Sequence, residues 1–483
     1  MAVPRNYKTT ILKKFIILFL IITNVLAAQD SSETKLSLEE CINLAIDNNI
    51  NFQRSRLRSE TEELNFRETK SQVLPTVNGS YSYAVNKGRS IDPYTNDVID
   101  QQFSFSNAGL RFNARIFNGF ELRNSIQRDR YNMEAAEAEK EAERQQLILD
   151  VTLAYFQILN NRDLLELARL RLESTKQQTD RVQILNEQGE GNPADYTDIL
   201  GQISNDRSAV IAAENQLKQS KLELTQLLNI NSEITVENFQ TLPEISAYDL
   251  TAEEVYSESL ENLKVFEARR LRLDAAQEDV SVARSLFSPE VSLFAQLNTN
   301  YSSLASLLNE TGTQVVETGQ FINVDGINYT VQSNQSQFSQ QDIPYFDQLN
   351  NNLSSVAGVS INIPVFNGFR AKRQVSLEKI QLKDAQLELE DTKNQYQQAI
   401  NQAYNAMQAA YDNYFVLQEQ VASYEESYRV NEIRFQNGVS NIVEYIISKN
   451  NLDRSRINLA NTKFEFLIRV KILDYYRGAN FSS

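Results

Sequence analysis

The chain has no histidine and no tryptophan, and Cys41 is its only cysteine. A single cysteine excludes an intrachain disulfide, so the fold must be held together by packing. The commonest general base and metal ligand is missing without histidine, which excludes a Ser-His-Asp triad, a Cys-His pair and an H-E-x-x-H zinc site. Carboxylate chemistry stays possible, but the acids form no clustered motif. We therefore expect no enzyme activity, no metal and no cofactor.

Long apolar runs are also missing after the N-terminal segment. In that later part of the chain no apolar run reaches the roughly 18 residues of a membrane-spanning helix. In the N-terminal segment, four basic residues and no acid precede an apolar run over residues 15–22, and Ala27 and Ala28 follow. This order predicts a secretory signal peptide over residues 1–28. An exported protein without an apolar helix can enter a membrane only as a β-barrel.

Basic residues are few after the signal segment. There, 43 Lys and Arg face 63 Asp and Glu, a formal charge of −20. Nucleic-acid affinity depends on neutralising phosphates with cations. We therefore expect no nucleic-acid partner.

The sequence contains a tandem repeat at an offset of 249 residues. Upstream the offset falls to 214, where Pro75 matches Pro289, so the second half carries about 35 extra residues between its strands. We predict a first repeat over 29–242 and a second over 243–483, joined near Leu242. The positions matched at 249 include 117–120 with 366–369, 154–155 with 403–404, Gly189 with Gly438, and Tyr196 with Tyr445.

Four segments, around 77–85, 110–116, 291–297 and 359–365, alternate apolar and polar residues. Period-two alternation predicts strands with one apolar and one polar face. A soluble sheet packed on a helix has the same alternation, but the signal segment favours membrane strands. Four strands cannot close a membrane barrel, which needs about eight or more, and an open edge cannot face lipid. A barrel would thus be shared, with two copies giving eight strands and three giving twelve.

Long helices follow the strands in each half. Residues 121–187 contain no proline and no glycine, which predicts a helix of roughly 100 Å. Shorter helices are predicted over 38–72 and 251–286, and tight turns at 189–193 and 437–441. Alternating spacings of four and three residues make a heptad seam in the long helix, and the seam recurs 249 residues later in the second half. In the first half it occupies positions 147, 151, 154, 158, 161, 165, 168, 172, 175, 179 and 182.

The ordered set of elements resembles the TolC-like outer membrane factors over essentially the whole mature chain. Residues 36–45, Leu-Ser-Leu-Glu-Glu-Cys-Ile-Asn-Leu-Ala, look like the first helix of that family. Residues 364–368, Pro-Val-Phe-Asn-Gly, are similar to its P-x-F-x-G junction between strand and helix. The first half departs there, because Arg115 stands in the place of the proline.

The resemblance implies a mainly α fold with a transmembrane β-barrel part, in which a homotrimer makes a twelve-stranded barrel above a periplasmic α-helical barrel. It implies an exit duct in the outer membrane with a large periplasmic part. The implied partners are outer-membrane lipid, a periplasmic adaptor (membrane fusion) protein and an inner-membrane transporter that supplies the energy. The competing hypothesis is a periplasmic coiled-coil scaffold or adhesin without a pore.

The resemblance also nominates adaptor-contact residues at the two helix turns, where the family carries an Arg and a Leu before the hairpin glycine. Plain turn chemistry is the alternative role. The candidates are Arg181, Leu185 and Gly189 in the first half, and Arg434, Gly438, Val439 and Ser440 in the second.

Glu444 matches the first of the family's periplasmic gate acids, and Asp195 occupies the equivalent place in the first half. Ile447 stands where a second acid would be, so the sequence matches only one acid of the family's double ring at this turn. Three copies of Glu444 around an axis would attract cations. A surface carboxylate near a helix N-terminus explains Glu444 equally well.

The segment 301–354 contains no Lys or Arg, and Asp325-Gly326 within it is a hairpin signal. We expect an extracellular loop that partly covers the pore mouth.

Overall fold

The computed structural model describes residues 34–92, 96–189, 192–231, 234–237 and 244–479. The predicted signal peptide, the linker near Leu242 and part of the first turn lie outside these ranges. The chain divides into two compact units. The first comprises residues 1–61, 134–270 and 387–483, and the second comprises 62–133 and 271–386.

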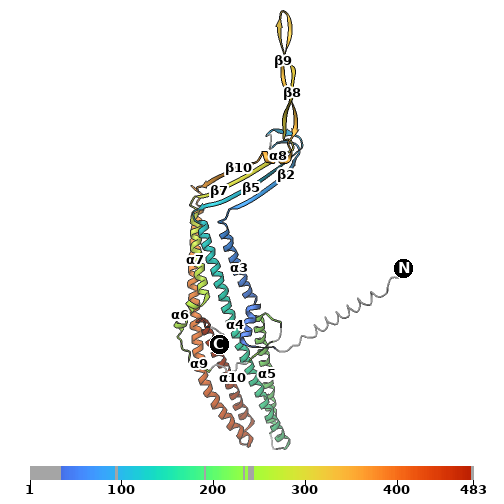
Figure 1. Ribbon diagram of the computed structural model, residues 1–483. Coiled ribbons are helices and arrows are strands. Elements are labelled where there is room, and N and C mark those ends of the chain that lie inside the picture. The colour runs from blue at the N-terminus through green and yellow to red at the C-terminus, as the bar shows by residue number, and fades with distance from the viewer. Residues whose placement is uncertain (1–33, 93–95, 190–191, 232–233, 238–243, 480–483) are drawn as a thin grey trace, which may run out of the picture. The chain divides into compact units, whose positions relative to one another are not determined.

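The second unit contains a four-stranded antiparallel sheet in the order β10-β7-β5-β2 (Figure 1). The four predicted strands are confirmed. The two outer strands, β10 and β2, each have one edge that pairs with no other strand among the described residues. The strands are β2 (Thr76–Asn86), β5 (Phe103–Asn118), β7 (Glu290–Ser302) and β10 (Ser354–Asn362).

The register puts most of the apolar residues of the four strands on one face, with Phe105, Phe294 and Val356 as exceptions on the other. Val77 lies opposite Phe112, Leu110 opposite Leu297, and Leu293 opposite Val359. Polar residues such as Asn78, Arg111, Gln296 and Ser360 take the other face, because successive side chains point to opposite sides. Many of the apolar side chains are more than half exposed, among them Val77, Tyr81, Tyr83, Leu110, Val359 and Ile361. The sheet therefore presents an apolar face that no other described residue of the chain covers.

The predicted hairpin in segment 301–354 is confirmed as β8 (Ser306–Val324) and β9 (Ile327–Asp342). Asp325 and Gly326 turn the chain with positive φ, as a two-residue hairpin turn requires. A buried hydrogen bond from the Ser302 backbone N–H to Gln348 Oε1 (3.0 Å) ties the end of β7 to helix α8 (Tyr345–Asn351). A short hairpin, β3 (Arg89–Ile91) with β4 (Val98–Asp100), joins β2 to β5.

Two helices of 67 residues follow the strand pairs, α4 (Glu121–Glu187) and α9 (Arg370–Gln436). The bounds of α4 are those that the absence of proline and glycine predicted. The seam is buried at most of its positions in α4, for example Val151, Ile158 and Thr175. Helix α4 turns into α5 (Pro193–Leu228), and α9 turns into α10 (Ile442–Tyr476).

The prediction of one helix over 38–72 and one over 251–286 is wrong, because each range contains two helices. The first contains α2 (Leu38–Asn48) and α3 (Ile50–Ser71), and the second contains α6 (Ala252–Asn262) and α7 (Lys264–Ser285). Asn49 adopts an extended conformation, and its Oδ1 accepts the backbone N–H groups of Asn51 and Phe52. The asparagine side chain therefore caps the new helix, which continuous periodicity could not reveal.

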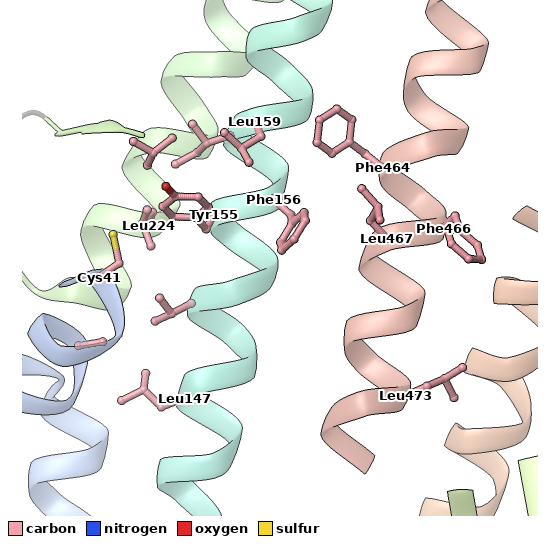
Figure 2. Close-up of a cluster of buried hydrophobic side chains, with 14 of the residues drawn as sticks. Cys41, Leu147, Tyr155, Phe156, Leu159, Leu224, Phe464, Phe466, Leu467 and Leu473 are labelled. Carbon is pink, nitrogen blue, oxygen red and sulfur yellow. The ribbon is translucent and has the colours of Figure 1, made fainter. Parts of the chain in front are cut away.

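The core of the first unit gathers where α2, α4, α5 and α10 meet (Figure 2). Tyr155 is 2% exposed, and its hydroxyl donates to the Glu237 carbonyl at 2.8 Å. This carbonyl follows β6 (Ile234–Val236), which pairs in parallel with β1 (Thr34–Leu36). Burial raises the pKa of the Cys41 thiol to about 12, so Cys41 acts as a core residue.

No helix within the described ranges has an apolar stretch long enough to cross a lipid bilayer.

Candidate functional site

Both predicted tip turns lie in the first unit, at the ends of the α4–α5 and α9–α10 hairpins. Gly189 and Gly438 have φ of 80° and 70°, the left-handed conformation that ends a helix. In the second turn the Val439 N–H donates to the Arg434 carbonyl at 2.8 Å, and the Gly438 N–H donates to the Phe435 carbonyl. Asn192 and Asn441 then cap α5 and α10. Turn chemistry therefore accounts for both glycines.

The gate candidate Glu444 and the tip candidate Arg434 lie on opposite sides of the second turn, and the structure brings them together. Arg434 Nη2 is 3.9 Å from Glu444 Oε2, with both side chains about half exposed. An ion pair this long and this exposed contributes under about 1 kcal/mol. The charge of Glu444 is therefore offset within its own chain, which the sequence did not indicate.

Asp195 lies in the first turn of α5, the position equivalent to Glu444. Burial, and then the charge of Asp198, raise the pKa of the Asp195 carboxyl above its ordinary value. No basic side chain offsets Asp195 in the way that Arg434 offsets Glu444 among the described residues. The two gate candidates therefore differ in their electrostatic surroundings.

Arg181 connects the two hairpins. Its Nη2 donates to the Gln436 carbonyl at 3.5 Å, at the last residue of α9. A cation near the last carbonyls of a helix is favourable. Leu185 is half-buried. The structure thus gives Arg181 a role within the chain beside any role toward a partner.

Val439 and Ser440 form the exposed corner of the second turn. Val439 is 66% exposed. Ser440 is half-buried, and its buried hydroxyl has no hydrogen-bond partner within the described part of the chain. These two residues are the tip candidates that the fold itself uses least.

An apolar cluster holds the tips of the two hairpins together. It contains Val182 from α4, Ile199 from α5, and Ile442 and Tyr445 from α10, all 3% exposed or less. The ring of Phe435 stacks on Tyr445 with centroids 5.4 Å apart. The gate and tip candidates therefore surround a packed cluster.

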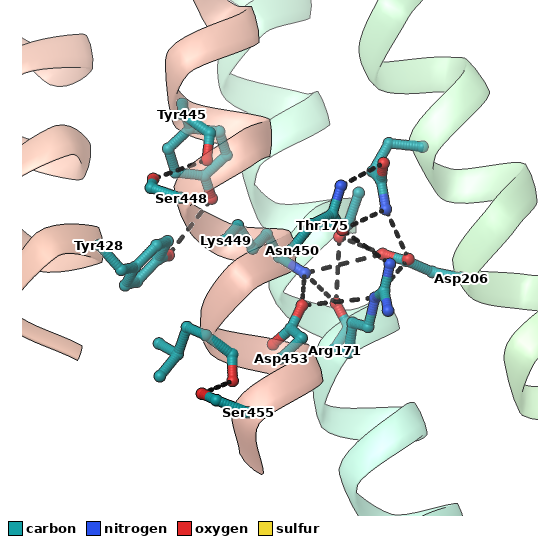
Figure 3. A network of polar contacts seen from close by, with 12 residues as sticks. Arg171, Thr175, Asp206, Tyr428, Tyr445, Ser448, Lys449, Asn450, Asp453 and Ser455 are labelled. Carbon is teal, nitrogen blue, oxygen red and sulfur yellow. Dashed lines mark hydrogen bonds and ion pairs between the residues drawn. The ribbon is translucent and has the colours of Figure 1, made fainter. Parts of the chain in front are cut away.

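A buried network of charged side chains lies further along the same helices, and the sequence did not point to it (Figure 3). Asp206 of α5 is completely buried. Its carboxylate lies 2.6 Å from Arg171 Nε and 3.7 Å from Lys449 Nζ. Lys449 Nζ also lies 2.9 Å from Asp453, and Arg171 Nε lies 3.3 Å from the same carboxylate.

The network is balanced, with two cations facing two anions from α4, α5 and α10. Neutral side chains complete it: Thr175 Oγ1 and Gln202 Nε2 donate to Asp206 at 2.5 and 2.8 Å, and Arg171 Nη2 donates to Asn450 at 2.8 Å.

One feature of the sequence could have indicated this network, since Asp206 follows Ile199 and Gln202 on the buried face of α5. A charge on such a face indicates a buried partner.

These residues can hold helices together and carry fixed charges, but they provide no centre for covalent chemistry. No group of three or more His, Cys, Asp or Glu side chains is placed to hold a metal ion within the described ranges.

Solved outer-membrane channels share this fold. A crystal structure of CusC, a protein that forms a transmembrane channel, matches with a TM-score of 0.74 and 17% identity, covering 92% of each chain. The Campylobacter jejuni CmeC outer membrane channel matches with a TM-score of 0.73 and 16% identity, covering 92% of this chain and 87% of that one. The mainly helical, channel-type fold is therefore confirmed.

The chain belongs to the outer membrane efflux protein family, whose model matches residues 41–230 and 255–475. It is 25% identical to the probable outer membrane lipoprotein SilC of Salmonella typhimurium over 54% of this chain and 55% of that protein. It is 25% identical to outer membrane protein TolC of Vibrio cholerae over 51% and 54%. The matches thus span about half the length of these curated relatives.

The family and these relatives confirm the predicted resemblance and the location in the outer membrane with a large periplasmic part. Members of this family are outer-membrane channels and not enzymes, which agrees with the expectation drawn from the missing histidine.

Proposed function

We propose that this protein is the outer-membrane exit channel of a tripartite transport system, in which three copies form one passive duct. The observation that carries the proposal is the four-stranded sheet, which has one exposed apolar face and two open edges. Lipid covers such a face, and closure with neighbouring copies removes the edges. Three copies contribute twelve strands, enough for a closed barrel.

The tandem repeat supports a ring and gives its register. Shifting the pair Val77–Phe112 of the first hairpin by 214 and 249 residues gives Val291–Ile361, which is a pair of the second hairpin. The pairing of β5 with β7 likewise predicts how β10 meets β2 of the next copy. In the pair Leu110–Leu297, Leu110 of β5 moves forward by 249 residues to β10, and Leu297 of β7 moves back by 214 residues to β2. These shifts place Val359 opposite Tyr83 of the neighbouring subunit.

The helices support the same arrangement. Ile50, Leu57 and Leu64 form a heptad-spaced stripe on α3 and are 59%, 56% and 62% exposed. Helix α7, the counterpart of α3, packs on α9 through Phe266 and Tyr396, with centroids 5.1 Å apart. We infer that the stripe on α3 packs against α9 of the next copy, which closes a periplasmic α-helical barrel.

Equal element lengths support the proposed repeats over 29–242 and 243–483. The helices of the first half have 11, 22, 67 and 36 residues, and those of the second, apart from the short α8 inserted between its strands, have 11, 22, 67 and 35.

The hairpin tips are the proposed contact with a periplasmic adaptor, which connects the duct to an inner-membrane transporter. Val439 is the strongest contact candidate, because it is exposed and because Arg181 and the two glycines already serve the fold. Ser440 follows it in the same turn. Leu185 and Arg434 are further candidates for this contact. Glu444 and Asp195 are the proposed gate acids, with Arg434 limiting the negative charge at Glu444. The β8–β9 hairpin is the proposed extracellular cover of the pore mouth.

Single-channel recording of the detergent-purified oligomer in a planar bilayer tests this proposal. Discrete conductance steps with cation preference are expected. A folded oligomer that never conducts, even after substitutions that loosen the tips, would favour the scaffold hypothesis instead.

A further inference from the structure

A cavity of about 370 Å³ lies in the second unit, where β5 passes into α4 and α7 ends. Gly119 forms its base: φ is +65°, and an added Cβ would lie 2.3 Å from the Cβ of Ser288. The start of α4 is thus pressed against the end of α7. The lining residues are Gly119, Phe120, Arg123, Asn124, Ser281, Arg284, Ser285 and Ser288.

The lining is basic and rich in hydroxyl groups. Arg123 comes from α4 and Arg284 from α7, and both side chains are exposed. Neither guanidinium takes part in an ion pair or side-chain hydrogen bond with another described residue, and no acid lines the cavity. Two acids close to the lining residues in sequence have other partners: Glu290 pairs with Arg115 at 3.7 Å, and Glu121 accepts a hydrogen bond from the Asn118 side chain at 3.4 Å. Two free guanidinium groups beside serines suit a phosphate, whose oxygens accept bidentate hydrogen bonds.

Two exposed aromatic residues are associated with the cavity: Phe120 lines it, and Phe287 directly precedes the lining residue Ser288. Phe120 and Phe287 are 57% and 58% exposed, and Phe117 packs edge-on against Phe120 with centroids 5.4 Å apart. Aromatic residues at the end of an apolar sheet face mark the level of lipid headgroups, where cations also meet anionic lipid. The surroundings therefore favour a phosphate attached to a lipid.

The second half repeats the basic positions. Shifting Arg123 by 249 gives Lys372, and shifting Arg284 back by 214 gives Lys70. Gly368, the counterpart of Gly119, has φ of +62° but nothing within 4 Å of an added Cβ. In a ring of copies, α3 of the neighbouring subunit would complete this second cavity.

We propose that the Arg123–Arg284 cavity binds the phosphate of an anionic phospholipid headgroup at the periplasmic side of the outer membrane. The inference rests on the proposed membrane channel, and it adds a lipid site to it. The two arginines hold the phosphate, the serines orient it, and Phe120 and Phe287 lie beside the acyl chains.

Native mass spectrometry of the detergent-purified oligomer tests the site, with added phosphatidylglycerol or phosphatidylcholine as probes. Wild-type protein is expected to retain phosphatidylglycerol at least about tenfold more tightly than the double variant Arg123→Gln/Arg284→Gln. The control Arg207→Gln/Arg454→Gln removes two exposed arginines of α5 and α10 and keeps wild-type binding. Arg284→Lys, which keeps the charge, retains part of it.

Equal retention by the wild type and the double variant, equal loss in the control, or no preference over phosphatidylcholine would overturn the proposal. Displacement of the lipid by millimolar inorganic phosphate would overturn the lipid source and assign the cavity to free phosphate. Bilayer recording separates this inference from the channel itself, because the double variant is expected to conduct like wild type. A wild-type oligomer that binds the lipid but does not conduct would contradict the proposed channel function and leave the lipid site intact.

Discussion

Replacing Asp206 by asparagine is expected to loosen the tip of α10. The Asp206 carboxylate is 0% exposed and contacts both Arg171 and Lys449. Its removal leaves two cations with the single counterion Asp453. Breaking a buried ion pair by removing one partner costs about 3–5 kcal/mol. Arg171 retains 20% exposure and Asp453 still faces both cations, so we expect about 3 kcal/mol.

Hydrogen exchange measured by mass spectrometry reads this effect locally, because amide exchange reports opening free energy segment by segment. A loss of about 3 kcal/mol corresponds to exchange over residues 445–455 that is roughly 150-fold faster. Asp180→Asn, an exposed change of the same charge on α4, is expected to alter stability by less than about 0.5 kcal/mol.

The double variant Asp206→Asn/Lys449→Met restores neutrality and is expected to recover most of the protection, since an apolar side chain can replace a buried charge without loss. Exchange that rises less than about fivefold in Asp206→Asn would refute the reasoning. So would a double variant that is less protected than the single one.

Three further outcomes follow from the same structure. Glu444→Gln leaves Arg434 without its partner, so cation selectivity and divalent-cation block should both fall in bilayer recordings; unchanged values would remove Glu444 from the gate. The raised pKa of Asp195 means that its carboxylate opposes folding at neutral pH and that this cost disappears as the pH falls through the folded pKa. Asp195→Asn should therefore raise the urea midpoint of unfolding at pH 7. The variant's midpoint should also increase less than that of the wild type when the pH is lowered, and a lower midpoint at pH 7 would contradict the reasoning. Gly119→Ala combines a positive φ with a contact to Ser288 and should cost about 1–3 kcal/mol, with partial recovery when Ser288→Gly is added; unfolding titrations that show no loss would contradict the close packing.

The strands and long helices could be predicted because their signals are local. Period-two alternation placed Val77, Leu110 and Val359 on one face, and the register confirms it. The missing proline and glycine gave the bounds of α4. The turn at Asp325-Gly326 followed from its two residues. Each of these features depends on a few neighbouring side chains.

The misses come from contacts between residues distant in sequence. The break at Asn49 depends partly on its hydrogen bond to the Leu227 carbonyl at 3.0 Å, 178 residues away. The network around Asp206 joins three helices, and a charged side chain viewed alone in the sequence is ordinarily assigned to solvent. The pairing of Arg434 with Glu444 required the turn geometry between them. The roles of the tip and gate candidates depend on partners and copies outside the chain, so they stay predictions.

Cysteine cross-linking between subunits tests the central claim most directly. Val359 and Tyr83 lie on the two outer strands of one sheet, three strand spacings or roughly 14 Å apart across the sheet. They are also offset along it, because Val359 is level with Ala114 of β5 and Tyr83 with Ser106, so they are too far apart for a disulfide within one chain. Cys41 is buried and should not compete. Oxidised Val359→Cys/Tyr83→Cys protein should run as a covalent trimer on a non-reducing gel, whereas Ser360→Cys/Tyr83→Cys, with one thiol on the other face, should not. Monomers alone, or dimers that never extend to trimers, would contradict a channel built from a ring of three copies.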